Sequence, residues 1–109
     1  MKTIRGFELQ YFEDDYGKEC SIQESSAYEP HIWLGVHKPE IRIMYKDAVA
    51  NGILVQKKYP ETNECGWCDL PIPSEAMIDS RMHLSRKQAK DLAAKLNYFA
   101  KHGCLREEV

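Results

Sequence analysis

The sequence predicts an α+β domain of two layers, in which an antiparallel sheet of about five or six strands packs against one C-terminal helix. Two observations predict this class. Apolar and polar residues alternate in short runs within residues 5–84, which is typical of half-buried strands. After residue 85 the apolar spacing changes to three and four residues, which is the period of a helix. At 109 residues, the chain is expected to form a single domain over residues 1–109.

The first two strands are predicted to form a β-hairpin. Residues 7–12 and residues 20–23 alternate between apolar and polar side chains. Residues 13–18 between them are typical of a turn, because Asp tolerates turn geometry and Gly17 can adopt a positive φ. The acidic run at the start of this turn lacks the regular ligand spacing of an EF-hand loop. We therefore interpret it as a solvated turn.

Further strands are expected downstream of this hairpin. Residues 31–36 alternate, with Trp33 on one face and Ile32 and Leu34 on the other. The remaining strands are expected over residues 41–45, 53–59 and 81–84, and residues 59–75 form a long loop with one short extended piece. Residues 46–52 fit either one helical turn or an extended hairpin, and the sequence leaves both alternatives open.

The C-terminal helix is predicted over about residues 86–102. Ser85 is a suitable N-cap, and Gln88 three residues later completes a capping box. Gly103 can end the helix in a left-handed conformation. An apolar stripe recurs at helical spacing and is expected to face the sheet as core; it consists of Ala89, Leu92, Ala93, Leu96, Phe99 and Ala100.

The two faces of the predicted sheet differ in character. The face expected to lie under the helix carries Phe7, Leu9, Ile22, Ile32, Leu34, Ile41, Ile43, Met82 and Leu84. The opposite face mixes aromatic, basic and amide side chains, namely Gln10, Phe12, Ser21, Gln23, His31, Trp33, Arg42, Met44, Arg81 and His83. This mixture favours a homodimer interface or a site that stacks a ring and pairs with anionic groups. An ordinary amphipathic sheet with one half-buried Trp fits as well.

Charge is unevenly distributed along the chain. The net charge is −2, so no overall attraction to duplex nucleic acid is expected. Residues 7–30 contain seven acids and one base, whereas residues 85–102 contain five bases and one acid. These segments form either two solvated faces of opposite sign or surfaces that steer self-association or a partner.

The N-terminal sequence predicts a cytoplasmic protein. Residues 1–5 lead directly into a polar strand with no signal peptide, and no apolar run is long enough for a membrane span. Thiols stay reduced in the cytosol, so the four cysteines are not interpreted as a disulfide framework.

One cysteine pair resembles a chemical motif. Cys65-Gly66-Trp67-Cys68 has the spacing of a thioredoxin-type redox site, but residues 69–73 contain two prolines and cannot form the helix that such a site needs. A structural zinc site needs four ligands, and this motif supplies two. Two loop thiols flanking a packed Trp67 are the preferred interpretation, with Cys65 and Cys68 as weak metal candidates. No nucleophile elbow, P-loop or dinucleotide fingerprint occurs, so neither catalysis nor a cofactor is expected.

Several segments together carry a resemblance to a known group of proteins. They are residues 12–17 leading into residues 20–26 (FEDDYG and CSIQESS), residues 32–36 (IWLGV) and residues 81–86 (RMHLSR). In these segments the chain resembles short, uncharacterised proteins found in bacteriophage and prophage genomes, whereas residues 65–68 lie outside the resemblance. The resemblance implies an accessory phage protein in the cytosol of the infected bacterium. Such proteins often inhibit host proteins or sequester nucleotide immune signals.

The function expected from these observations is non-catalytic binding by a homodimer or higher homo-oligomer. The specific hypothesis is counter-defence by sequestering a nucleotide-like anion. Trp33 would stack on the base, and Arg42, Arg81, His83 and Arg86 would meet the phosphate, with helix N-terminal amides after Ser85 adding to the anion site. One alternative is an inhibitor that binds a host protein through the same face or the acidic hairpin. Another is a small zinc-stabilised regulatory domain.

Overall fold

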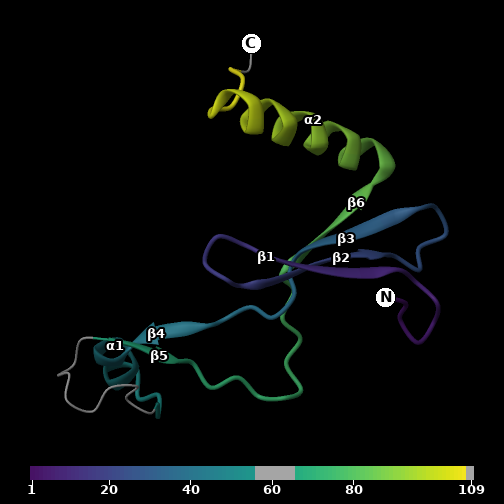
Figure 1. The fold of residues 1–109 in the computed structure, drawn as a ribbon. Coiled ribbons are helices and arrows are strands. Elements are labelled where there is room, and N and C mark those ends of the chain that lie inside the picture. The colour runs from purple at the N-terminus through teal and green to yellow at the C-terminus, as the bar shows by residue number, and fades with distance from the viewer. Residues whose placement is uncertain (56–65, 108–109) are drawn as a thin grey trace. The chain divides into compact units, whose positions relative to one another are not determined.

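The computed structural model describes residues 1–55 and 66–107 of the chain (Figure 1). Their contacts divide into two compact units, which are described separately. The first unit contains residues 1–38 and 80–109, and the second contains residues 39–79. The second unit is therefore inserted in sequence between two strands of the first. The expectation of a single domain stays a prediction.

The first unit is built on a four-stranded antiparallel sheet. Its strands lie in the order β1 (Leu9–Glu13), β2 (Glu19–Glu24), β3 (His31–Val36) and β6 (Arg81–Ser85). The long helix α2 (Arg86–His102) follows β6 directly (Figure 1). The predicted α+β class is confirmed, as are the N-terminal hairpin and the limits of the C-terminal helix.

The turn between β1 and β2 is held by one aspartate. The Asp14 carboxylate accepts hydrogen bonds from the backbone amides of Tyr16 at 2.9 Å and Lys18 at 2.8 Å. Gly17 adopts a φ of +79°, which its lack of a Cβ permits. The acidic run therefore forms a hydrogen-bonded turn, which pairs Glu13 with Glu19 at the start of the ladder.

The strand register corrects the predicted distribution of side chains between the two faces. Leu9 lies opposite Gln23, which lies opposite Trp33, so Leu9 shares the face of Trp33. Phe12 lies opposite Cys20, which lies opposite Val36, so Phe12 lies on the other face. The prediction had these two residues of β1 reversed. Alternation within a strand shows which residues share a face, but only pairing with the neighbouring strand shows which face it is.

The helix α2 has the predicted caps. The Ser85 hydroxyl accepts from the Gln88 amide at 3.2 Å, and the Gln88 side chain accepts from the Ser85 amide at 3.0 Å. Gly103 ends the helix with a φ of +73°, and its amide donates to the Phe99 carbonyl. Basic residues Lys101 and His102 occupy the last turn, where they complement the helix dipole.

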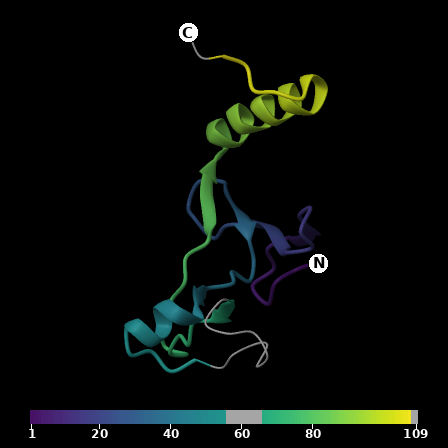
Figure 2. The same ribbon diagram turned by 90° about the vertical axis from the view of Figure 1, so that its left-hand side faces the viewer.

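The expected burial of the helical stripe under the sheet is wrong for this chain by itself. No residue of α2 is buried, and Leu96 and Phe99 are 56% and 52% exposed. Because β6 ends at Ser85 and α2 begins at Arg86, no loop allows the helix to fold back over the sheet. Figure 2 shows α2 continuing away from the end of β6.

The second unit contains a small sheet and a short helix. Strand β4 (Arg42–Met44) pairs with β5 (Trp67–Asp69) in antiparallel register, and α1 (Tyr45–Ala50) follows β4. The segment for which the sequence left two alternatives is thus helical over most of its length. Ala48 and Cys68 are buried in this unit. The strand expected over residues 53–59 lies partly outside the described residues, and Ile53–Val55 is irregular.

The strands expected in one sheet therefore divide between two sheets. Arg42 and Met44 were placed on the same face as Trp33, but they belong to the two-stranded sheet. Strand pairing depends on contacts between distant residues, which alternation along the chain does not reveal. Within the described residues, no helix has the length and apolar character needed to cross a membrane.

Candidate functional site

One face of the four-stranded sheet carries a stack of aromatic rings. Trp33 on β3 lies opposite His83 on β6, and their rings stack with centroids 4.2 Å apart. The His83 ring also stacks on His31, with centroids 4.7 Å apart and an interplanar angle of 20°. We call the face that carries these rings the tryptophan face. It presents flat π surfaces of the kind on which a planar ligand can stack.

A guanidinium lies beside this stack. The Arg81 guanidinium carbon is 5.6 Å from the centroid of the Trp33 ring, within the range of a cation–π contact. One guanidinium nitrogen donates to the Gln23 side-chain oxygen at 2.8 Å and to the Ser21 hydroxyl at 3.3 Å. These partners are neutral, and Arg81 forms no ion pair within the described residues. Its positive charge is therefore held in place without being neutralised by a carboxylate.

The backbone of β3 makes room for this arginine. Gly35 lies opposite Arg81 and has a φ of +151°. A Cβ added to Gly35 would lie 2.9 Å from the Ser80 carbonyl oxygen and 3.1 Å from the Arg81 Cα. Both neighbours are backbone atoms and cannot move aside alone. Glycine at this position thus allows the backbones of β3 and β6 to approach each other closely at Arg81, the first residue of β6.

Beneath Arg81, a buried hydroxyl connects three strands. The Ser21 side chain on β2 is fully buried and contacts Nδ1 of His37 at 3.1 Å as well as Arg81. The His37 ring packs edge-on against Tyr11 of β1, with centroids 5.0 Å apart. A buried hydroxyl needs hydrogen-bond partners, and these two satisfy it. The network links Arg81 to β1 and fixes its orientation.

The histidines of the stack are also anchored. Nε2 of His83 contacts the Ser25 hydroxyl at 2.8 Å, and Nδ1 of His31 contacts the Glu29 carbonyl oxygen at 2.8 Å. The second contact requires a proton on Nδ1 of His31, because a carbonyl only accepts. Both hydrogen-bond partners belong to the segment that connects β2 and β3, so this segment holds both rings in place. The stack is preorganised before any ligand arrives.

A pocket of about 500 Å³ opens beside Trp33. It is lined by the N-terminal residues Met1–Arg5, by Phe7 and Leu9, and by Gln23, Glu24, Ser26 and Trp33. The N-terminal segment is fastened to Glu8, whose carboxylate contacts the N-terminal ammonium at 2.9 Å and the Lys2 ammonium at 3.4 Å. The hydrogen bond from the N-terminal ammonium lowers the pKa of the Glu8 carboxyl, so this carboxylate remains charged at neutral pH.

The Arg5 side chain adds a second cation near this pocket. Its guanidinium carbon lies 5.7 Å from the centroid of the Phe7 ring, and both residues line the pocket. The lining of the pocket therefore includes both the aromatic residue Trp33 and the basic residue Arg5. Its volume falls within the range of small-molecule sites in proteins, about 300–1,000 Å³.

The predicted site residues do not all meet. Trp33, Arg81 and His83 form the cluster described above. Arg42 lies in β4 of the second unit, where its side chain contacts Glu40 at 3.6 Å. Sequence reasoning gave no role to His37 and Tyr11, since their contacts follow from register and from a loop conformation. The alternation of Ser21 with Cys20 did place Ser21 on the tryptophan face.

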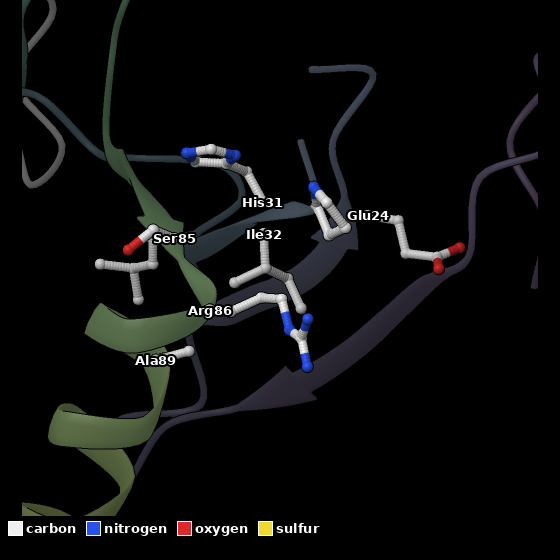
Figure 3. Close-up of a pocket in the computed structure, with 8 residues that line it drawn as sticks. Glu24, His31, Ile32, Ser85, Arg86 and Ala89 are labelled. Atoms are coloured by element: carbon white, nitrogen blue, oxygen red, sulfur yellow. The ribbon is translucent and has the colours of Figure 1, made fainter. Parts of the chain in front are cut away.

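Arg86 is not part of the cluster formed by Trp33, Arg81 and His83. It lines a second pocket, of about 240 Å³, with Ile32, Leu84 and Ala89. Ile32 and Leu84 are paired in register and alternate with Trp33 and His83, so they lie on the other face, whereas His31 of the ring stack also lines this pocket. Figure 3 shows Arg86 extending from the first turn of α2 alongside Ile32. Arg81, Trp33 and His83 do not line this pocket.

The cysteine motif falls only partly within the described residues. Cys65 lies outside them, and Cys68 is buried in β5. Over residues 1–55 and 66–107, no group of three or more His, Cys, Asp or Glu side chains is arranged to hold a metal ion.

The arrangement on the tryptophan face suits binding. Stacked rings can take up a planar group, and a guanidinium without a carboxylate partner can meet an anion. Comparison of the chain with protein-family models, with curated proteins and with solved structures finds no match.

Proposed function

We propose that this chain is a non-catalytic binding protein that takes up a nucleotide-like anion on the tryptophan face. The observation that carries the proposal is Arg81, whose guanidinium lies over Trp33 and has only neutral hydrogen-bond partners. A base would stack on the ring surface of Trp33, and phosphate oxygens would pair with Arg81. The adjoining pocket supplies volume and the second guanidinium of Arg5.

The biological setting proposed is that of a bacteriophage accessory protein. The segments at residues 12–17, 20–26, 32–36 and 81–86 support it through their resemblance to short phage and prophage proteins. In that setting the protein would act in the cytosol of the infected bacterium as a homo-oligomer. Sequestering a nucleotide immune signal would need affinity but no catalysis, which fits a preorganised site.

Thermal shift measurements test the site directly. The full chain is heated with AMP, ADP-ribose and cyclic dinucleotides in turn, and at least one is expected to raise the melting temperature. Trp33→Ala and Arg81→Ala should each abolish that shift, because they remove the stacking surface and the anion partner. Circular dichroism of both variants establishes that the fold survives.

The second unit supplies matched controls. Trp67→Ala removes an exposed Trp of β5, and Arg42→Ala removes an exposed Arg of β4. Both should retain the full shift. If Arg42→Ala loses binding as strongly as Arg81→Ala, the site assignment is wrong. If the wild-type chain shows no shift but co-purifies with a host protein in native mass spectrometry, the inhibitor hypothesis replaces ligand sequestration.

A further inference from the structure

Two apolar surfaces of the first unit are not covered by any other element of that unit. The apolar face of the sheet lies opposite the tryptophan face and carries Phe12, Cys20, Ile22, Ile32, Leu34, Val36, Met82 and Leu84. The helix stripe consists of Ala89, Leu92, Ala93, Leu96, Phe99 and Ala100. On the first surface Phe12 and Met82 are 45% and 49% exposed, and on the second Leu96 is 56% exposed.

The unit lacks a core of its own in this arrangement. Among its described residues only Leu9, Cys20 and Ser21 are buried. Even a domain of about 60 residues normally buries roughly 60% of the surface that its unfolded chain exposes. Fixing the backbone carries an entropic cost that buried apolar surface must offset. The side chains suited to that purpose are present, but both surfaces that carry them face outward.

We propose that a second copy of this chain covers both surfaces, with the α2 stripe of each copy packed across the apolar face of the other. The arrangement is reciprocal, as expected for a two-fold symmetric dimer. The two layers that the sequence predicts, a sheet and a covering helix, then come from two different copies of the chain. The expected helix-on-sheet contact forms, but the helix comes from the partner.

The dimensions of the two surfaces match. From Ala89 to Phe99 the stripe extends roughly 15 Å at the rise of an α-helix. Four strands at the usual spacing span about 14 Å between the outer two. A helix laid across the sheet would therefore contact all four strands. The pocket shared by Ile32, Leu84 and Ala89 marks where the apolar face and the stripe adjoin within one copy.

The distribution of charge also supports a second copy of this chain as the partner that covers the two apolar surfaces. Between residues 7 and 30 the sequence has seven acids and one base, and these acids border the β1–β2 hairpin. Glu24, at the end of β2, accepts a hydrogen bond from the Glu8 backbone amide at 2.6 Å, which holds a carboxylate at this end of the β1–β2 hairpin. The helix segment is basic, and at helical spacing Lys90 and Lys95 flank the stripe on opposite sides. The basic helix of one copy thus meets the acidic hairpin of the other.

This inference rests on the self-association included in the proposed function, and it names the surface involved. It is separate from ligand binding, because the tryptophan face lies on the other side of the sheet. Loss of the dimer and loss of nucleotide binding are therefore distinguishable.

Sedimentation velocity of the full chain tests the proposal. The wild-type protein is expected to sediment with twice its chain mass of 12.7 kDa. Leu96→Asp should give a monomer, because it places a charge in the middle of the stripe. Ala94→Asp is the matched control, since Ala94 is exposed on the helix side opposite the stripe and tolerates the same new residue. That variant should remain dimeric.

A mixing experiment separates a broken interface from a misfolded chain. Met82→Lys places a cation on the apolar face and should also give a monomer. An equal mixture of Leu96→Asp and Met82→Lys should restore the dimer mass. In the mixed dimer, the helix of the Met82→Lys chain packs on the unaltered sheet of the Leu96→Asp chain. In the second contact, the new Asp of one chain meets the new Lys of the other.

The remaining outcomes overturn the proposal at different levels. A monomeric wild-type chain overturns both self-association and this interface. A dimeric Leu96→Asp variant, or a mixture that stays monomeric, overturns the interface alone.

Discussion

At the scale of single residues, the site depends on one glycine as much as on the side chains that would touch a ligand. Gly35 faces Arg81 across β3 and β6, and its φ of +151° is rarely open to other residues. From this backbone position Arg81 donates hydrogen bonds to Ser21 and Gln23. The close approach of β3 and β6, the position of Arg81 and the proposed anion site therefore all depend on this pair of residues.

Gly35→Ala is expected to destabilise the protein more than Gly17→Ala, because a strained backbone position costs about 1–3 kcal/mol at either glycine and only Gly35 adds a steric clash. The new Cβ would press on the Ser80 carbonyl and the Arg81 Cα. Urea unfolding followed by circular dichroism measures the loss. Gly17→Ala is the control, because its φ is also positive but no atom lies within 4 Å of the added Cβ. If both variants lose the same free energy of unfolding, the close approach of β3 and β6 at Gly35 is not the cause of the destabilisation.

The residues of the tryptophan face were largely predictable, whereas their contacts were not. Alternation over residues 31–36 and 81–84 placed Trp33, Arg81 and His83 together. Leu9 and Phe12 were assigned to the wrong faces because the register of β1 depends on the turn at Asp14. Arg42 was included because nothing in its strand shows that it pairs in a separate sheet.

At the scale of elements, α2 shows which properties a sequence specifies locally. Its start at Arg86 and its end before Gly103 were predicted correctly, because caps act on backbone groups within one turn. The surface against which its apolar stripe packs was not predicted. An amphipathic pattern shows that a helix needs an apolar neighbour, but it does not show which surface that neighbour is. A direct β6–α2 junction leaves that neighbour to another chain under the proposal above.

Ser85→Ala should cost about 1 kcal/mol of stability through loss of the N-cap. The hydroxyl accepts from the Gln88 amide, which would otherwise lack an intrahelical partner. Chemical denaturation, followed by the circular dichroism signal of the helix, measures this change in the free energy of unfolding. Ser85→Asp should recover most of it, because a carboxylate caps equally well and complements the helix dipole. Failure of Asp to rescue would show that Ser85 acts through packing instead.

At the scale of the whole molecule, the α+β class followed from local periods, but the division into two sheets did not. Strands β4 and β5 pair with each other, and the chain enters this unit after β3 and returns before β6. Alternation was equally clear in both sets of strands. Which strands pair is decided by contacts far apart in sequence, and these leave no periodic signal.

The dimer proposal makes stability depend on protein concentration. If each copy supplies the cover for the other's apolar face, unfolding includes dissociation, and mass action raises the melting temperature as protein is added. A tenfold increase in concentration changes the free energy by about 1.4 kcal/mol per dimer, or roughly 0.7 kcal/mol per chain. For a domain of this size, that amounts to a rise of roughly 3–5 °C. Differential scanning calorimetry over a concentration series measures it. Ala94→Asp should show the same rise, whereas Leu96→Asp should melt lower and at one temperature throughout. A wild-type melting temperature that stays constant over the series would mean that the apolar face and the helix stripe are not covered by a second copy.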